Sequence, residues 1–285
     1  STGMLYVPQS VNAITVKNVT VENVAAAFNI TYSGDALFEE VTLNNVTYGI
    51  HFQIWGSRTY TVKNCDLKGA TNPFWFWDKS NNTQKVTVVF EGNNDLGTKS
   101  ITVNAGALKL AAGATLTAAE SLTISTEKDY EVVYENGIYS TVAKNYVAQI
   151  GDTKYESLQE AIVAAAPSGT VELLSDVTVD KWIMFAEKLS IGNGNLITLN
   201  INGLTINGNN HKLTIKDIES AGNGNRLFYD AQNLNINDLT IEYIDGAANL
   251  GGIGLTSGTI KNVTFIGGGY GVLPGAADVT IEDCT

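Results

Sequence analysis

Charged residues are scarce in this sequence. Charged residues make up 16% of its 285 residues, against about 25% in an average soluble protein. Only 17 are basic while 29 are acidic, which gives a formal net charge of −12, and the basic ones are scattered singly. Nucleic-acid binding requires Lys and Arg clustered against a run of phosphates, so no nucleic-acid partner is expected. An acidic surface is equally unsuited to an anionic membrane.

The sequence also lacks long apolar runs and clusters of His or Cys, which limits the kinds of site that it can form. No apolar run approaches the roughly 20 residues that a membrane-spanning helix needs, so no membrane insertion is expected. The two histidines, His51 and His211, and the two cysteines, Cys65 and Cys284, stand in unrelated contexts. No metal-ligand spacing and no His-based triad can be assembled from them. We therefore predict no metal, no cofactor and no catalytic residue, and we interpret both cysteines as small buried apolar side chains.

What the chain does have is a recurring phrase: an apolar residue, a spacer, Asn or Asp, and another apolar residue. Within two clusters its copies start about 19–27 residues apart. A repeat of roughly 20–30 residues built from short strands is typical of a solenoid, in which each repeat buries its apolar face only against its neighbours. The copies begin at Val16, Leu43, Val62, Ile215, Ile236, Ile260 and Ile281.

The residues around each phrase alternate between apolar and polar, as in Ile14-Thr15-Val16. Such alternation is typical of strands with one buried face. Asn and Asp tolerate the left-handed backbone conformation, so they supply a sharp bend between two strands. We expect one interior column and one bend column. The interior column is Val19, Val46, Cys65, Ile218, Leu239, Val263 and Cys284, and the bend column is Asn18, Asn45, Asn64, Asp217, Asp238, Asn262 and Asp283.

The middle of the chain departs from this rhythm. Residues 130–144 predict a β-hairpin that turns at Asn136-Gly137. Ser157 begins a capping box, and apolar residues at helical spacing follow over 158–165. The sequence therefore predicts three parts: a β-solenoid stretch over 1–126, a hairpin and capping helix over 127–169, and a second β-solenoid stretch over 170–285.

The second half resembles a known family in the passages 147–155, 157–166, 170–177 and 199–206. These passages are similar to the start of right-handed parallel β-helix repeats in the pectate-lyase-like superfamily, which occur in large bacterial cell-surface proteins, especially of gut Firmicutes. The resemblance implies an all-β fold, a right-handed parallel β-helix in two stretches joined by a hairpin and one short capping helix. It also implies an extracellular or bacterial cell-surface location. For the first half it rests on the repeated phrase alone.

One segment is unusually aromatic. Phe74, Trp75, Phe76 and Trp77 are consecutive, and Trp55 is near them in the sequence. On a strand, Phe74 and Phe76 would point to one side and Trp75 and Trp77 to the other. Exposed rings would form a platform for a glycan or a partner, whereas rings folded over the solenoid would complete its packing. Both interpretations stay open at this point.

The order of the parts is also informative. A solenoid must cover both ends, because a bare end exposes unpaired strands and a section of core. Here the predicted cap lies in the middle of the chain. If a second copy followed directly after Thr285, the phrase at Ile281 would precede the phrase at Val16 of that copy by about 20 residues, the ordinary repeat length. We expect the ends to continue head-to-tail, in a tandem array or as stacked copies; boundaries placed by chance are the alternative. The residues of this joint are Val16, Asn18, Val19, Ile281, Asp283 and Cys284.

These observations favour a non-catalytic structural or adhesive protein whose partner is itself. The alternative is a carbohydrate-binding or carbohydrate-active β-helix protein, a polysaccharide lyase or glycoside hydrolase. For that chemistry Asp217 and Asp238 would be paired carboxylates if they lay on adjacent rungs, about 5 Å apart. A lyase would also need a base, and the arginines, Arg58 and Arg226, stand beside no cluster of acids. Since Asn fills the same place in other phrases, we interpret both aspartates as bend residues.

Overall fold

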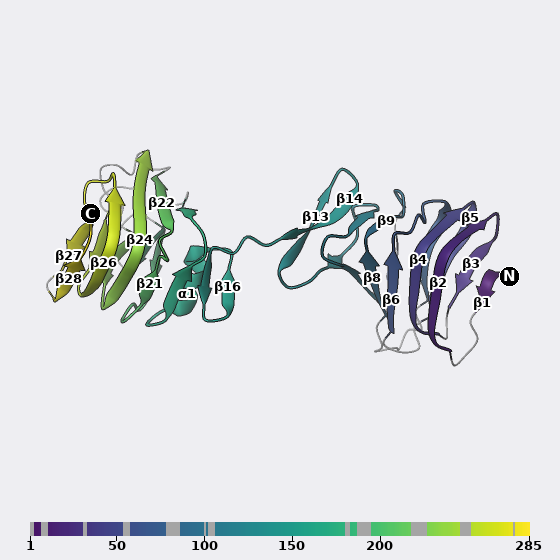
Figure 1. Cartoon of the computed structure of the whole chain (residues 1–285), viewed down its shortest axis with the longest axis horizontal. Helices are drawn as coiled ribbons and strands as arrows, with labels where there is room; N and C mark the ends of the chain where they lie inside the picture. The colour runs from purple at the N-terminus through teal and green to yellow at the C-terminus, as the bar shows by residue number, and fades with distance from the viewer. Residues whose placement is uncertain are drawn as a thin grey trace. The chain divides into compact units, whose positions relative to one another are not determined.

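A computed structural model gives the fold of the chain (Figure 1). It describes residues 3–6, 11–30, 33–53, 58–77, 86–99, 101, 106–179, 183–186, 195–217, 227–245, 252–275 and 277–285. The described chain is nearly all β, with parallel strands stacked as a β-solenoid of about nine turns. It divides into two compact units, unit 1 from Ser1 to Lys144 and unit 2 from Asn145 to Thr285. The all-β solenoid prediction is therefore confirmed.

Unit 1 stacks its strands in parallel sheets that run along the solenoid. The sheet orders are β1-β3-β5-β7 and β12-β10-β8-β6-β4-β2, and a third sheet, β13-β14-β11-β9, ends in a hairpin. The strands are β1 (Gly3–Tyr6), β2 (Val11–Glu22), β3 (Ala26–Asn29), β4 (Ser33–Asn44), β5 (Val46–Gln53), β6 (Arg58–Lys63), β7 (Ala70–Trp77), β8 (Val86–Glu91), β9 (Asn93–Asp95), β10 (Gly106–Leu110), β11 (Thr115–Thr117), β12 (Ile124–Ser125), β13 (Tyr130–Glu135) and β14 (Ile138–Ala143).

Unit 2 repeats this construction after one helix, α1 (Leu158–Ala165). Its sheet orders are β16-β15-β17-β21-β24-β22-β18, with β26 and β28 added beyond β24, and β20-β19-β23-β25-β27. The strands are β15 (Ala148–Ile150), β16 (Thr153–Tyr155), β17 (Thr170–Leu173), β18 (Val177–Val179), β19 (Ile183–Ala186), β20 (Asn195–Thr198), β21 (Thr205–Asn207), β22 (Lys212–Asp217), β23 (Phe228–Ala231), β24 (Leu234–Asp245), β25 (Ile253–Leu255), β26 (Gly258–Ile266), β27 (Val272–Pro274) and β28 (Val279–Glu282).

The bends between strands are made by residues in the left-handed conformation, as predicted. Backbone φ lies between 51° and 54° at six of the seven predicted bend residues, Asn18, Asn45, Asn64, Asp238, Asn262 and Asp283, whereas the seventh, Asp217, does not have a positive φ. A left-handed residue costs least when it is Gly, Asn or Asp. Six of the seven copies of the phrase therefore mark a place where the chain turns a corner of the solenoid.

The corners form two columns rather than the single one we predicted. In the pairing of β2 with β4, Lys17 lies opposite Glu39 and Val19 opposite Val41, so the neighbour of Asn18 is Glu40. Glu40 has a φ of 54° and makes the same bend. The prediction that Asn45 stacks with Asn18 is wrong. Asn45 lies over Asn23, which forms the next corner after Asn18 in the first coil. The amide of Asn45 donates a hydrogen bond to Asn23 Oδ1 at 2.8 Å.

The predicted burial is confirmed well inside each unit, but Val46 does not lie in the column of Val19 and Cys65: it follows the corner at Asn45 and pairs with Ala70 on β7. Cys65 and Val46 are each 2% exposed, Leu239 is 3% exposed and Val263 is fully buried. Val19 and Cys284 are partly buried and pack against the same cores, because they lie on the first and last rungs. Ile218 falls outside the described residues.

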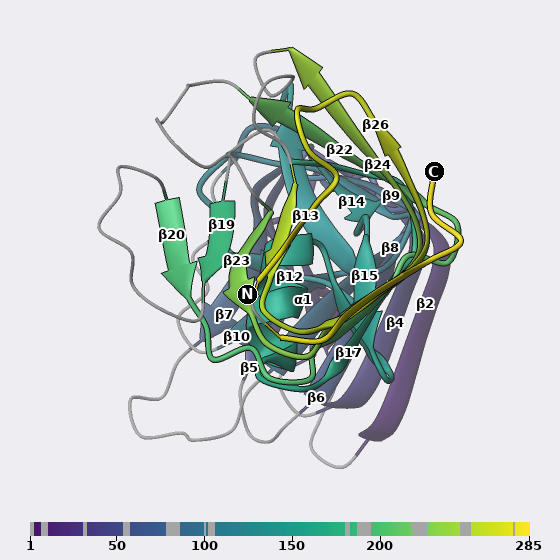
Figure 2. The ribbon, with the colours of Figure 1, turned by 90° about the vertical axis from the view of Figure 1, so that its left-hand side faces the viewer.

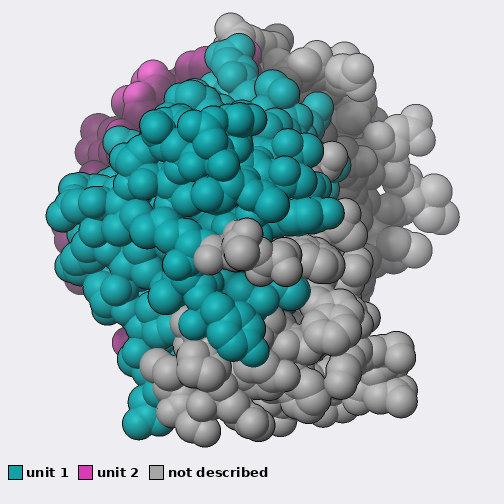
Figure 3. All heavy atoms as spheres, turned by 90° about the vertical axis from the view of Figure 1, so that its right-hand side faces the viewer, with its two compact units in different colours: residues 1–144 teal, residues 145–285 magenta. Residues whose placement is uncertain are grey.

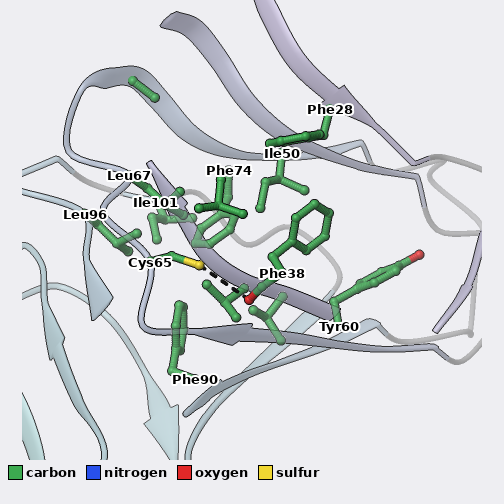
Figure 4. Close-up of a cluster of buried hydrophobic side chains, with 14 of the residues drawn as sticks. Phe28, Phe38, Ile50, Tyr60, Cys65, Leu67, Phe74, Phe90, Leu96 and Ile101 are labelled. Atoms are coloured by element: carbon green, nitrogen blue, oxygen red, sulfur yellow. Dashed lines mark hydrogen bonds between the residues drawn. The ribbon is translucent and has the colours of Figure 1, made fainter. Parts of the chain in front are cut away.

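The core of unit 1 is rich in aromatic rings (Figure 4). Phe52 lies 4.7 Å from Tyr60 between ring centroids and 5.5 Å from Phe74, and Phe74 lies 5.9 Å from Phe90. Each ring buries a large apolar area and gains from the tilted contact. The Cys65 thiol donates to the carbonyl of Phe38 at 3.4 Å inside this core, and its burial raises the pKa of the thiol.

Each unit is covered at the end that lies nearer the middle of the sequence. The predicted hairpin is confirmed: β13 and β14 pair antiparallel, and Asn136 and Gly137 form the turn with positive φ. Strand β14 also pairs antiparallel with β11, so the hairpin covers an edge of unit 1. In unit 2, β15 pairs antiparallel with β17, and α1 packs against both strands. The junction between the units thus falls at Lys144, within the segment 127–169.

The predicted helix is confirmed at its predicted start. Ser157 is the N-cap, and its hydroxyl accepts a hydrogen bond from the backbone N–H of Glu160. Leu158, Ala161, Ile162 and Ala165 are buried. None of the helical residues in the described chain forms a segment long and apolar enough to cross a membrane.

Candidate functional site

The paired-carboxylate arrangement is contradicted by the strand register. β22 pairs with β24 so that Asp217 lies opposite Asp245, whereas Asp238 is the corner residue before Leu239 in the same β24. The turn that faces Asp238 is formed by 208–211, where the N–H of Asn210 donates to the Asp238 carbonyl. The phrase at Ile215 is thus part of a strand, and Asp217 and Asp238 are not neighbours on adjacent rungs.

Nor do other acids gather into a metal-type site. Among the described residues there is no group of three or more His, Cys, Asp or Glu side chains placed to hold a metal ion. Of the two arginines, Arg58 begins β6 and lies opposite Val86, while Arg226 falls outside the described residues.

A pocket of 420 Å³ opens beside the cap of unit 2, next to α1 and β18. Asp176 lines this pocket and accepts a hydrogen bond from the backbone N–H of Lys212 at 2.9 Å. That hydrogen bond, with the neighbouring His211, lowers the pKa of Asp176. Since Lys212 belongs to the next coil, Asp176 links two coils, which is a structural role.

The aromatic segment forms a strand, and part of it belongs to the core. β7 pairs with β5 so that Trp75 lies opposite His51 and Trp77 opposite Gln53. Phe74 is 5% exposed and packs between Phe52 and Phe90, so it stabilises the solenoid and takes no part in an exposed platform. The side chains of Trp75, Phe76 and Trp77, and all of Trp55, fall outside the described residues; the platform they would form stays a prediction.

The predicted assembly residues lie on β2 and β28 or directly after β28, and each of these strands has one unpaired edge in the described chain. In the described chain, β2 pairs only with β4, and β28 pairs only with β26. Beside them, β1 pairs only with β3, and β27 only with β25. Figure 2 looks onto the end of unit 2 that holds the last coil, in yellow, and Figure 3 looks onto the end of unit 1 that holds the first.

The open rung of unit 2 exposes apolar core. Ile236, Ile260 and Ile281 are register partners on β24, β26 and β28. The first two are fully buried, whereas Ile281 is 51% exposed. The difference arises because, among the residues that the structure describes, Ile281 has a neighbouring rung on one side only. Covering this side chain with another rung would remove apolar surface from water, which is favourable.

A column of alternating charges runs beside the corners of unit 1. Lys17, Glu39, Lys63 and Glu91 are register partners on successive rungs. Glu39 lies between two ammonium groups, 2.6 Å from Lys17 Nζ and 3.0 Å from Lys63 Nζ. Their hydrogen bonds, that of Lys17 first, lower the pKa of Glu39. Cross-strand pairs of opposite charge favour this register over a shifted one.

Unit 2 has a shorter version of the same column. Lys261 lies opposite Glu282, with Lys261 Nζ 3.0 Å from Glu282 Oε1. In the described chain, Glu282 therefore has a lysine on one side, where Glu39 has one on each side. Sequence reasoning missed these charged residues, because Glu39 precedes a corner that the phrase does not mark, and the alternation appears only when the strands are in register.

Polar side chains also connect the corners from coil to coil. The amide of Asn262 donates to Asp238 Oδ1 at 2.6 Å. At another corner of unit 2, the Asn233 amide donates to Asn202 Oδ1 at 2.7 Å, and the Ser257 hydroxyl donates to Asn233 Oδ1 at 3.1 Å. These ladders repeat once per rung, so they constrain which residue of one coil lies over which residue of the next.

The described geometry thus places the candidate site at the open rungs: unpaired strand edges, exposed core, left-handed corners and one side of a charge column. The residues that carry it are Val16, Lys17, Asn18, Val19, Ile281, Glu282, Asp283 and Cys284. Comparison with known proteins identified no match to a family model, a curated protein or a solved structure.

Proposed function

We propose that this chain is a non-catalytic structural or adhesive protein whose open rungs pair head-to-tail with further copies, forming a fibre or an array. The observation that supports it best is an asymmetry between the ends of each unit. The mid-chain ends carry antiparallel caps, β14 on β11 and β15 on β17. In the described chain, the parallel strands β2 and β28 at the far ends are each paired on one side only, and strand addition would use the other side.

The contact would be heterologous, because the two open rungs are different surfaces. A head-to-tail contact that does not close produces a filament. Each joint would add main-chain hydrogen bonds along β2 and β28 and would cover the exposed side chain of Ile281. The role proposed is mechanical, in a stalk, filament or matrix strand. An extracellular or cell-surface location follows from the resemblance to bacterial β-helix repeats.

Negative-stain electron microscopy of the purified 285-residue chain, across a range of concentrations, tests the assembly. We expect filaments of uniform width, with sedimentation that increases with concentration. Compact monomers at the highest concentration reached would overturn the proposal.

The carbohydrate-active alternative needs its own assay. Pectin, alginate and host glycans are incubated with the chain, and new reducing ends or unsaturated products are measured. We expect no turnover. Turnover that Asp238→Asn abolishes would replace the structural proposal with an enzymatic one.

A further inference from the structure

We propose that the joint has a single register, set by pairing of Glu282 of one copy with Lys17 of the next. This inference rests on the proposed head-to-tail assembly, and it names the partner as a second copy of this chain. Three features of the open rungs support it: the left-handed corners, the length of the segment after each corner, and the column of alternating charges.

The first feature is the corner. Asp283, with a φ of 52°, follows β28, and Asn18, with a φ of 53°, lies within β2. Inside each unit the left-handed corners of adjacent rungs coincide, as Asp238 and Asn262 do. Placing Asp283 over Asn18 continues that column across the joint. The same placement puts Ile281 over Val16, Glu282 over Lys17 and Cys284 over Val19.

The second feature is the shape of the coil after the corner. In unit 1, the segment 19–22 leads from Asn18 to a second left-handed residue, Asn23. In unit 2, the segment 263–266 leads in the same number of residues from Asn262 to Gly267, which also has positive φ. The coils on the two sides of the joint therefore turn at the same interval, so rungs stacked there follow one path.

The third feature is charge, and it identifies the partner. With the corners aligned, the column across the joint reads Lys261, Glu282, then Lys17, Glu39, Lys63 and Glu91 of the next copy, so its sign alternates without interruption. Glu282 would lie between two lysines, as Glu39 does. A slip of one residue would break the corner column and turn every side chain to the other face.

The same alignment also lets the sheet that ends at β27 continue into the sheet that begins at β1. With β28 beside β2, the open edge of β1 comes to the side of the solenoid that carries β27, whose own partner is β25. Both sheets of unit 2 would thus continue into the two sheets of unit 1 that begin with β1 and β2. The strand pairs next to the open rungs, β1 with β3, β2 with β4, β25 with β27 and β26 with β28, are all parallel, so a parallel addition preserves their geometry.

The test is a charge-reversal experiment with complementation. Glu282→Lys and Lys17→Glu are made as separate proteins, and the concentration at which each begins to sediment as filaments is compared with that of the parent chain. Each single variant places like charges at every joint, so we expect the required concentration to rise about five- to tenfold. In an equimolar mixture the Glu282→Lys end meets the Lys17→Glu end with opposite charges, so we expect assembly to return toward the parent concentration.

Glu91→Lys is the matched control, because Glu91 lies in the same column opposite Lys63, three rungs into unit 1, and its reversal leaves Lys17 and its partner Glu39 unchanged. We expect it to assemble like the parent chain, and circular dichroism to show that all variants are folded. Added salt should shrink the difference between each single variant and the parent. The register is wrong if the single variants assemble normally, or if the mixture fails as each variant does alone. Failure of the parent chain to assemble would instead refute the proposed function.

Discussion

Glu40 is the one residue other than Gly, Asn and Asp that has a positive φ in the described chain. It makes a left-handed corner with a φ of 54°, a conformation that costs an ordinary L-residue roughly 1–2 kcal/mol and that Asn adopts more readily. Its neighbours in the corner column are Asn18 and Asn64. The sequence pattern missed this corner because Glu is not a bend residue, and only the pairing of β2 with β4 places it there.

We therefore expect Glu40→Asn to raise the free energy of unfolding by about 0.5–1 kcal/mol. Urea unfolding of the variant and the parent chain measures the change. Glu131→Asn is the control, since Glu131 is an exposed residue inside β13 and Asn has low strand propensity. Equal effects of the two substitutions would mean that the corner conformation is not the source of the gain.

At the level of the strand and its corner, the repeated phrase predicted strands and corners. It did not predict which corner of the coil each copy forms. The phrase fits any corner at which the chain turns sharply, because it consists only of an apolar residue, a spacer, Asn and another apolar residue. The phrase ending in Val46 therefore marks a second corner of the coil, and the one at Ile215 is no corner at all. Which rung lies over which depends on pairing between residues far apart in sequence, and no local pattern reports it.

The caps show the same difference between local structure, which the sequence predicts, and long-range pairing, which it does not. Asn136-Gly137 and Ser157 predicted a hairpin and a helix start, because turn and capping chemistry are local. The pairing of β14 with β11 joins distant segments, and it had no sequence signature. The candidate site was predicted in part: the corner residues at the open rungs were found, while the charges beside them became meaningful only with the register.

The interior column gives a direct test of an element's contribution. Leu239 is 3% exposed, so Leu239→Ala leaves a cavity and should lower the free energy of unfolding by about 2–5 kcal/mol. Ile266→Ala is the control on β26, where the side chain is 44% exposed, and it should cost less than about 1 kcal/mol. Denaturant unfolding compares the two variants. Similar losses would contradict the placement of Leu239 in the core.

At the scale of the whole molecule, the two cysteines report on assembly without any substitution. Cys65 is 2% exposed and burial raises the pKa of its thiol, whereas Cys284 is partly exposed on the open rung. Thiolates are the reactive form, so a thiol reagent should modify Cys284 of the monomer and spare Cys65. In filaments Cys284 should become protected.

Mass spectrometry of monomers and filaments after brief labelling measures both sites. Complete labelling in denaturant shows that each thiol is chemically intact. Equal labelling of Cys284 in monomers and filaments would place the joint elsewhere.

The two open rungs carry different residues, Lys17 on one and Glu282 on the other, and this gives the polymer a direction. Every copy added would leave the same kind of end exposed at the same tip, so the two tips would grow at unequal rates. A copy that keeps one good end and has lost the other would join a growing tip and stop it. Small amounts of such a copy would then set the length of the fibres, in the way a terminating nucleotide sets the length of a copied strand.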